Sequence, residues 1–170
     1  LLVVSALPGC ASSSAARGSG ETAERAVRLV RIGVVRSPYE SAPAAPRQGA
    51  LAPDVESTIV VDSEYEAGLK DIETFSHLIV LYAFDRSSGW SPLVQTPWEE
   101  ERHGVFASRS YRRPSPIGMT IVRLVGREGT TLRVQGLDAL DGTPVVDLKP
   151  YLPRFDCPDG ANEGWLGARR

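Results

Sequence analysis

Apolar and polar residues alternate along much of this chain with the two-residue period of β-strands. Residues 132–135 (Leu-Arg-Val-Gln) show the alternation of a half-exposed strand. Residues 78–84 form a continuous apolar run that is too short for a typical helix, and it predicts a central strand buried on both faces. Similar apolar, β-branched segments predict further strands at residues 27–36, 58–61, 117–125 and 143–148.

The segments between the predicted strands are turns and long loops. Residues 126–130 form a tight connection, so we expect the strands at 117–125 and 132–135 to pair as a hairpin. Residues 64–74 predict a brief helix or turn, and the proline-rich segment 37–53 and residues 86–103 predict two long loops. The expected fold class is therefore all-β, a small and mainly antiparallel β-barrel with short helical turns and long loops, because closure removes exposed strand edges.

Composition fits one ordinary domain and limits the partners. The chain has 170 residues, of which 42% are hydrophobic and 24% are charged, and a net charge of −2 argues against a protein that simply coats nucleic acid. The charge is uneven, since residues 50–75 carry seven acidic side chains and one basic one, and residues 109–154 carry eight basic side chains and four acidic ones. This excess is either a face that steers a polyanion or scattered, solvated arginine.

The N-terminal residues differ in composition from the rest of the chain. The first residues are largely apolar, and Leu7-Pro8-Gly9-Cys10 precedes a Ser/Ala/Gly-rich run. This pattern resembles the end of a bacterial lipoprotein signal, which would make Cys10 a lipidated membrane anchor; the alternative is a disordered tail. We accordingly expect a tail or signal remnant at residues 1–26, a barrel domain at 27–156 and a C-terminal tail at 157–170.

Generic catalytic and metal-binding patterns are missing from the sequence. We find no G-x-G-x-x-G motif, no phosphate-binding loop and no G-x-S-x-G elbow. Only two cysteines and two histidines, His77 and His103, are available, and we expect no metal site. We expect His77 to be a structural hydrogen-bonding residue and His103 to be solvated.

Five segments carry a resemblance to a known family. They read I-G-V-V-R-S-P-Y at 32–39, P-R-Q-G at 46–49, F-S-H-L-I-V-L-Y-A-F at 75–84, G-V-F-A-S-R-S-Y-R-R-P-S-P-I-G-M-T at 104–120 and L-D-A-L-D-G-T-P-V-V-D-L-K-P-Y-L-P at 137–153. They resemble the tRNA threonylcarbamoyladenosine methyltransferases, the TsaA-like or TrmO-like β-barrel enzymes, over about residues 30–156.

The resemblance implies an activity and partners. Members of this family transfer a methyl group from S-adenosylmethionine to the exocyclic nitrogen of a threonylcarbamoyl-modified adenosine beside the tRNA anticodon. They are similar β-barrels that pair as homodimers, and such an enzyme would work in the cytoplasm. The chain departs from the family at Ser115, where asparagine is usual, at Tyr111, where proline or threonine is common, and at Asp85-Arg86, which replaces a histidine-containing pair.

The resemblance also implies a cofactor site. Arg109 is suited to the carboxylate of the methyl donor, because a guanidinium matches a carboxylate with two parallel hydrogen bonds. For Met119, ordinary core packing is the stronger interpretation. The residues expected to contact S-adenosylmethionine are Arg47, Gln48, Gly49, Asp85, Arg86, Arg109, Met119, Leu137, Asp138, Ala139 and Leu140.

The residues that would act on the acceptor stay open at this stage. An acceptor nitrogen next to a carbonyl needs a carboxylate or phenolate to draw off its proton, and the candidates are Asp138, Asp141, Asp147 and Tyr151. Asp141-Gly142 is equally a plain turn signal. The basic residues expected to meet tRNA phosphates are Arg112, Arg113, Lys149 and Arg154. The alternatives are a non-catalytic barrel that binds S-adenosylmethionine or a nucleoside, and a methyltransferase with a different acceptor.

Overall fold

The computed structural model describes residues 27–97 and 100–169. The predictions for residues 1–26, including a lipidated Cys10, lie outside the described residues. In the part of the chain that the structure describes, no helix is long and apolar enough to cross a membrane.

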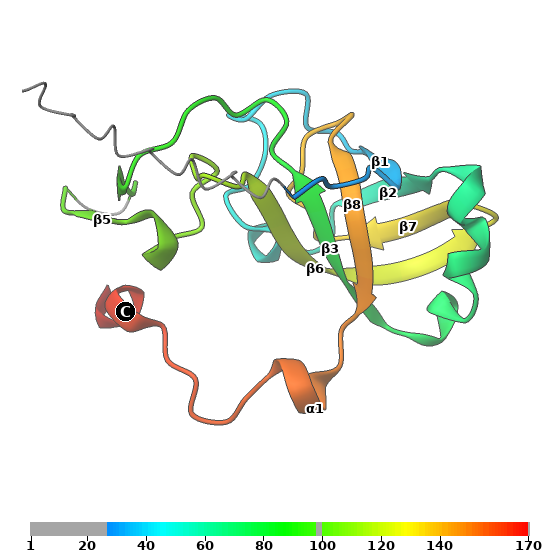
Figure 1. The fold of residues 1–170 in the computed structure, drawn as a ribbon. Helices are drawn as coiled ribbons and strands as arrows, with labels where there is room; N and C mark the ends of the chain where they lie inside the picture. The colour runs from blue at the N-terminus through cyan, green and yellow to red at the C-terminus, as the bar shows by residue number, and fades with distance from the viewer. Residues whose placement is uncertain (1–26, 98–99, 170) are drawn as a thin grey trace, which may run out of the picture.

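Six antiparallel strands close into a barrel (Figure 1). Around the barrel they run in the order β1-β2-β7-β6-β3-β8, and each pairs with its neighbours in antiparallel register. The strands are β1 (Gly33–Arg36), β2 (Glu56–Val61), β3 (His77–Ala83), β6 (Ile117–Glu128), β7 (Thr131–Gln135) and β8 (Pro144–Pro150). The predicted all-β fold class is confirmed.

Alternate residues of the strands fill the barrel interior. Leu78, Val80 and Tyr82 of β3 are buried, and so are Ile59 of β2 and Leu132 of β7. Each large apolar side chain removed from water in this way contributes about 1.5–3 kcal/mol, so the barrel core is the main source of stability. The expectation that residues 78–84 are buried on both faces is wrong, because Ile79 and Leu81 lie on the outer wall and are only partly covered.

The predicted first strand is shorter in the structure. Of the expected strand at 27–36, only residues 33–36 form β1, although the backbone of Ile32 also bonds to Val145 and Asp62 on either side. Val27, Leu29 and Val30 are more than half exposed despite being apolar. The predicted hairpin is confirmed, with β6 and β7 joined by Gly129, whose φ of 57° favours glycine, and Thr130.

The segment predicted as a loop at 86–103 contains a second small sheet. Strands β4 (Leu93–Gln95) and β5 (Arg102–Gly104) pair antiparallel and lead into the 3-10 helix η4 (Val105–Ala107). We call residues 85–116 the lobe. The predicted helical turn at 64–74 is confirmed as two 3-10 helices, η2 (Ser63–Leu69) and η3 (Ile72–Thr74). The remaining short helices are η1 (Gly49–Leu51), α1 (Pro153–Asp156) and η5 (Gly164–Arg169).

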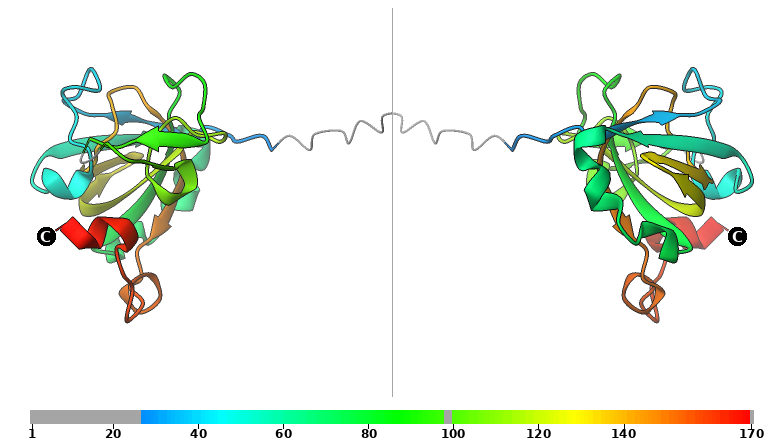
Figure 2. Two further views of the ribbon diagram at one scale, coloured as in Figure 1. Left: turned by 90° about the vertical axis from the view of Figure 1, so that its left-hand side faces the viewer. Right: turned by 90° about the vertical axis from the view of Figure 1, so that its right-hand side faces the viewer.

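Different connecting segments lie at the two ends of the barrel, because consecutive antiparallel strands run in opposite directions. Segments 37–55, 84–116 and 136–143 connect strands at one end, which we call the loop end. Segments 62–76 and 129–130, and the chain that follows Pro150, leave the barrel at the other end, the far end. Both side views in Figure 2 show the chain after β8 looping below the barrel before η5 returns alongside it.

Candidate functional site

Two hydrogen bonds join three of the family-like segments at the loop end. Arg109, in the lobe, donates from Nη1 to Gln48 Oε1 over 2.6 Å. The next residue, Gly49, donates its backbone N–H to Asp138 Oδ2 over 3.1 Å. The Gln48-Gly49 pair therefore links Arg109 to the 137–140 turn, although these segments are far apart in the sequence.

The Asp138 carboxylate is the centre of this arrangement. Besides the Gly49 N–H, it accepts a hydrogen bond from the Tyr82 hydroxyl at 2.9 Å and another from the Thr120 hydroxyl. Burial, followed by the negative charge of Asp138, raises the pKa of the Tyr82 phenol above its ordinary value, so Tyr82 is a neutral donor here. With three donors from β3, β6 and η1, Asp138 fixes the loop end to the barrel wall.

Gly49 is required by the closeness of two backbones. A Cβ atom at position 49 would lie 1.8 Å from the carbonyl oxygen of Gly136, and this backbone oxygen cannot move aside as a side chain can. Gly136 itself has a φ of 80°, in the left-handed region that favours glycine. The P-R-Q-G segment thus ends in glycine for a packing reason.

The segment around Arg109 is held by bonds on both sides of it. Arg113 donates from Nη1 to the carbonyls of Ser108 and Ser110, each over 3.2 Å, and so brackets the residue between them. Tyr111 packs edge-on against Phe84 at the end of β3, with ring centroids 6.2 Å apart. Arg109 is exposed, and its guanidinium points to the Gln48 side of the loop end.

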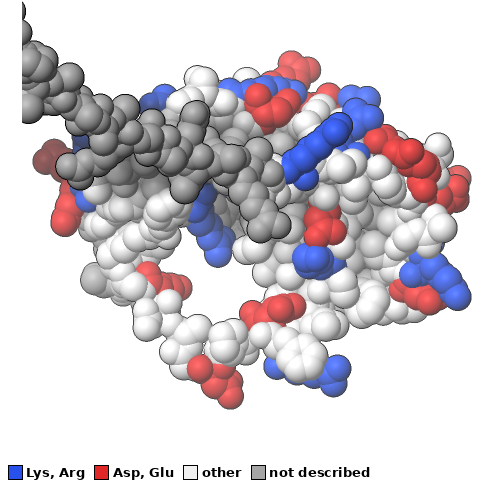
Figure 3. All heavy atoms as spheres, viewed as in Figure 1, with Lys and Arg blue, Asp and Glu red and all other residues white. Residues whose placement is uncertain are grey.

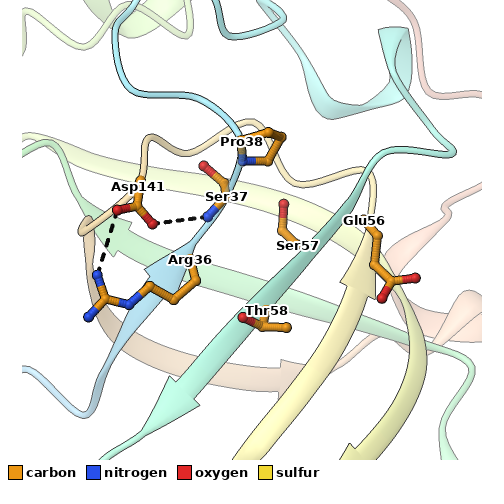
Figure 4. Close-up of a pocket in the computed structure, with 7 residues that line it drawn as sticks. All are labelled: Arg36, Ser37, Pro38, Glu56, Ser57, Thr58 and Asp141. Carbon is orange, nitrogen blue, oxygen red and sulfur yellow. Dashed lines mark hydrogen bonds and ion pairs between the residues drawn. The ribbon is translucent and has the colours of Figure 1, made fainter.

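Asp141 lies at the edge of an open cavity (Figure 4). Its carboxylate accepts a hydrogen bond from the Ser37 N–H at 3.2 Å and lies 3.6 Å from the Arg36 guanidinium, while Arg86 donates to its backbone carbonyl. The cavity has a volume of about 360 Å³ and is lined by Arg36, Ser37, Pro38, Glu56, Ser57, Thr58 and Asp141. Neither Arg109 nor Gln48 is among the lining residues, so the cavity and the Arg109–Gln48 pair are separate features of the loop end.

Several predicted cofactor residues have other surroundings in the structure. Leu137 and Ala139 are buried at 1% and 3% exposure and belong to the barrel core, so only their backbone could face a ligand. Met119 is half exposed on the outer wall of β6, and the interpretation as core packing is wrong. Asp85 is exposed at the start of the lobe.

Three predicted residues lie at the far end. Lys149, Tyr151 and Arg154 belong to the end of β8 and the segment after it, where the Tyr151 N–H donates to the His77 carbonyl over 3.1 Å. His77 and Tyr82 are five residues apart on β3, which places Tyr151 about 17 Å from the level of Asp138. Burial, followed by the negative charges of the Cys157 thiolate and of Asp156, raises the pKa of the Tyr151 phenol further above neutral pH, which disfavours a phenolate base. In a single chain, Tyr151 is therefore apart from the loop end and poorly suited to be a base.

The fourth base candidate is on the outer wall. Asp147 of β8 lies 2.7 Å from Lys149, and both side chains are substantially exposed. Within residues 27–97 and 100–169, no three His, Cys, Asp or Glu side chains are grouped so that they could hold a metal ion.

Sequence reasoning missed two contributors to the loop end. Tyr82 and Thr120 were assigned only to strands, yet their hydroxyls hold Asp138. The alternation of inward and outward residues along β3 and β6 could have identified them, because both carry a polar group at an inward-facing position. A buried hydroxyl needs a partner, and that requirement predicts a polar contact inside the barrel end.

Comparison with known proteins gives the family. The model of the tRNA-methyltransferase O N-terminal domain matches residues 34–157, which is most of the chain. The chain belongs to this family. Its match begins in β1 and ends just after α1, so this domain contains the whole barrel and the lobe but not η5.

Two relatives and one solved structure show what the chain is similar to. A probable S-adenosyl-L-methionine-binding protein of Pyrococcus abyssi is 47% identical over 135 residues, which cover 79% of this chain and 73% of the relative. The tRNA (adenine(37)-N6)-methyltransferase of Escherichia coli is 41% identical over 133 residues, covering 72% of this chain and 57% of the relative. The crystal structure of TrmO from Pseudomonas aeruginosa superimposes with a TM-score of 0.72 at 35% identity, covering 84% of this chain and 63% of that one. The chain thus spans less than two thirds of the latter two proteins.

Proposed function

We propose that this protein is an S-adenosylmethionine-dependent methyltransferase that acts on tRNA. The observation that carries the proposal is the family match over residues 34–157, combined with the bonds from Arg109 through Gln48 and Gly49 to Asp138. In finer detail, we propose that the acceptor is the exocyclic nitrogen of a threonylcarbamoyl-modified adenosine next to the anticodon. The name of the Escherichia coli relative, which specifies N6 of adenine 37, supports this choice of nitrogen.

The residues at the loop end suit the proposed cofactor. S-adenosylmethionine supplies a methyl group on a positively charged sulfur and carries a carboxylate tail. The Arg109 guanidinium has five N–H donors, and an exposed position next to the Gln48 amide leaves room for a carboxylate to take a bidentate pair. We propose that Arg109 and Gln48 bind the tail, with Arg47, Gly49, Arg86 and the 137–140 turn around it.

We propose Asp141 as the base in preference to Asp138. The Asp138 carboxylate already accepts three hydrogen bonds, whereas Asp141 lines the open cavity and its side chain is 40% exposed. A base must have a lone pair that faces the acceptor within hydrogen-bond reach. An Asp141→Asn variant should lose most of its turnover while its affinity for S-adenosylmethionine changes little. A variant with unchanged turnover would refute this assignment.

The proposed tRNA contacts fall into two groups. Arg112 and Arg113 lie at the loop end, and Lys149 and Arg154 lie at the far end. Figure 3 shows basic and acidic side chains interspersed over one face of the molecule, so phosphate contacts there would come from individual side chains rather than from a broad basic patch. We propose that Arg112, which is exposed and lies over the Tyr111 ring, makes the first of these contacts.

We further propose that the chain forms a homodimer through the outer wall of β3 and β6. Ile79 and Leu81 pair there with Ile121 and Met119, and the last two are 45% and 50% exposed. Contiguous exposed apolar residues of this kind are typical of protein interfaces. Sedimentation should show a dimer that Ile121→Lys converts to a monomer, and a monomeric wild type would refute the proposal.

The experiment that tests the proposed activity is methyl transfer from labelled S-adenosylmethionine to tRNA. We expect label in tRNA that bears threonylcarbamoyladenosine and none in the same tRNA without that group. Arg109→Ala should weaken cofactor binding about 10- to 100-fold, as expected for loss of a charge-assisted pair. Arg123→Ala is the matched control, because Arg123 bonds to Gln135 on the exposed wall.

The outcomes separate the alternatives. Binding of S-adenosylmethionine without label in any tRNA would favour a non-catalytic binding barrel; the name of the Pyrococcus abyssi relative refers to such binding. Label in unmodified tRNA would indicate a different acceptor. We propose a cytoplasmic location, where tRNA and cofactor meet; recovery of the product in the membrane fraction would favour the lipidated Cys10 alternative.

A further inference from the structure

The chain after the barrel returns to the lobe that carries Arg109. Residues 151–169, which we call the strap, leave the barrel at the far end, and Figure 3 shows an open gap between the middle of the strap and the barrel. The strap then ends in η5, which lies near β5 in Figure 1. A segment with little support along its middle needs specific contacts to hold its end in place.

Trp165 makes those contacts. Its indole ring stacks on the His103 imidazole with centroids 3.8 Å apart and the two planes within 5° of parallel. Its Nε1–H donates to the carbonyl of Ala107 over 2.9 Å. His103 belongs to β5 and Ala107 ends η4, so one side chain holds two consecutive elements of the lobe. The expectation that His103 is simply solvated is wrong.

These contacts are immediately before Arg109 in the chain. Ala107 is two residues from Arg109, and Ser108 between them is itself bonded through its hydroxyl to Val105 and through its carbonyl to Arg113. A displacement of η4 would therefore move the backbone that aims the Arg109 guanidinium at Gln48. Because η5 begins at Gly164, it lies beyond residue 157, where the family match ends. The contact therefore involves a segment outside the range that the family model matches.

We propose that Trp165 is a positioning residue that holds the lobe so that Arg109 is oriented for the carboxylate of S-adenosylmethionine. This inference rests on the proposed function for its ligand, but the contact between the strap and the lobe does not. A loop that is correctly ordered only part of the time binds with an affinity reduced by that fraction. Loss of one stacked ring and one hydrogen bond should thus weaken binding by roughly fivefold, without abolishing it.

The test compares Trp165→Ala with Leu166→Ala in the full chain. Leu166 is the adjacent residue of η5 and is 42% exposed, so it is the matched control. Trypsin reports on the lobe without any cofactor, because it cleaves after Arg102, Arg109 and Arg112, all of which are exposed. We expect faster cleavage at these sites in Trp165→Ala and the wild-type rate in Leu166→Ala. Equal rates in the two variants would overturn the strap contact.

Calorimetry with S-adenosylmethionine then tests the positioning role. We expect Trp165→Ala to bind about fivefold more weakly than wild type, and Trp165→Phe, which keeps a ring for stacking, to recover part of the affinity. In an Arg109→Ala background the Trp165→Ala effect should disappear, because the two residues act as one unit. An unchanged affinity, or an effect that persists without Arg109, would overturn the proposal.

The same data distinguish failure of the proposed function. If the wild type binds no S-adenosylmethionine, the proposed function and the positioning role both fail, whereas the proteolysis result still decides whether Trp165 holds the lobe. If the wild type binds S-adenosylmethionine and Trp165→Ala binds it with the same affinity, the proposed function stands and this inference alone is overturned.

Discussion

Replacement of Asp138 by asparagine tests the centre of the loop end. The asparagine has almost the same shape, so the change removes the charge and turns one acceptor into an N–H2 donor. One carboxylate oxygen accepts from Tyr82 and Thr120, and the other accepts from the Gly49 N–H. In the variant the side-chain oxygen can serve the two hydroxyls, and its N–H2 group then faces the Gly49 N–H.

The cost follows from these three bonds. A hydrogen bond to a charged acceptor contributes about 1.5–3 kcal/mol and one to a neutral acceptor about 0.5–1.5 kcal/mol. Asp138→Asn loses one bond and converts two to the neutral kind, so we expect a loss of about 3.5–6 kcal/mol in the free energy of unfolding. For a chain of this length that corresponds to a fall in Tm of about 10–20 °C.

Urea unfolding followed by far-UV circular dichroism measures the effect. The matched control is Asp147→Asn, which removes the exposed ion pair with Lys149 but keeps an oxygen that can accept from the Leu148 N–H, and which should cost less than about 1 kcal/mol. A loss in Asp138→Asn no larger than in this control would refute the arrangement. So would simple additivity with Tyr82→Phe, because residues that share a hydrogen bond must be coupled.

Three further predictions follow from the same end of the barrel. Gly49→Ala should cost more than about 3 kcal/mol or prevent folding, because its Cβ would meet the Gly136 carbonyl, while Gly68→Ala, with open space around it, should be neutral or stabilising in thermal melts. The contribution of Tyr82 to stability should be constant up to about pH 10 and be lost above it, because the folded protein has the raised pKa of Tyr82 and the unfolded chain loses the proton first. In urea titrations above pH 10, the free energy of unfolding should therefore fall less steeply for Tyr82→Phe than for the wild type. Arg112→Ala should weaken tRNA binding and reduce the slope of log affinity against log salt by about one in filter-binding assays, and an unchanged slope would exclude a phosphate contact.

The extent to which the sequence predicts this fold depends on how local the signal is. The hairpin of β6 and β7 and the helical turn after β2 follow from alternation and turn residues within a few positions. Residues 27–31 have a similar composition but are in no strand, because strand formation needs a partner that composition does not reveal. The β4–β5 sheet was missed for the opposite reason, because three-residue strands are too short to show a period.

The candidate site depends even more on contacts between distant residues. Arg109 was predicted from its motif, but its bond to Gln48 joins residues 61 positions apart, and the Gly49 bond to Asp138 joins residues 89 positions apart. The periodicity of apolar and polar residues gives no information about contacts between such distant positions. The resemblance to a family placed these segments in one site, and the structure adds the order in which they are bonded.

The segment 137–153 shows why a continuous family motif need not be a single site. Its first part, through Asp141, forms the turn that holds Gly49 and borders the cavity. Its second part is β8, which crosses the barrel wall, so Tyr151 emerges at the far end beside His77. The inward Val145 and the paired register with β3 are demands of the barrel, and they would constrain this segment whatever the loop end binds. We therefore expect substitutions in β8 to lower stability, and to lower activity only as a consequence. Asp141→Asn keeps an oxygen that can accept from the Ser37 N–H, so we expect it to lower activity more than stability.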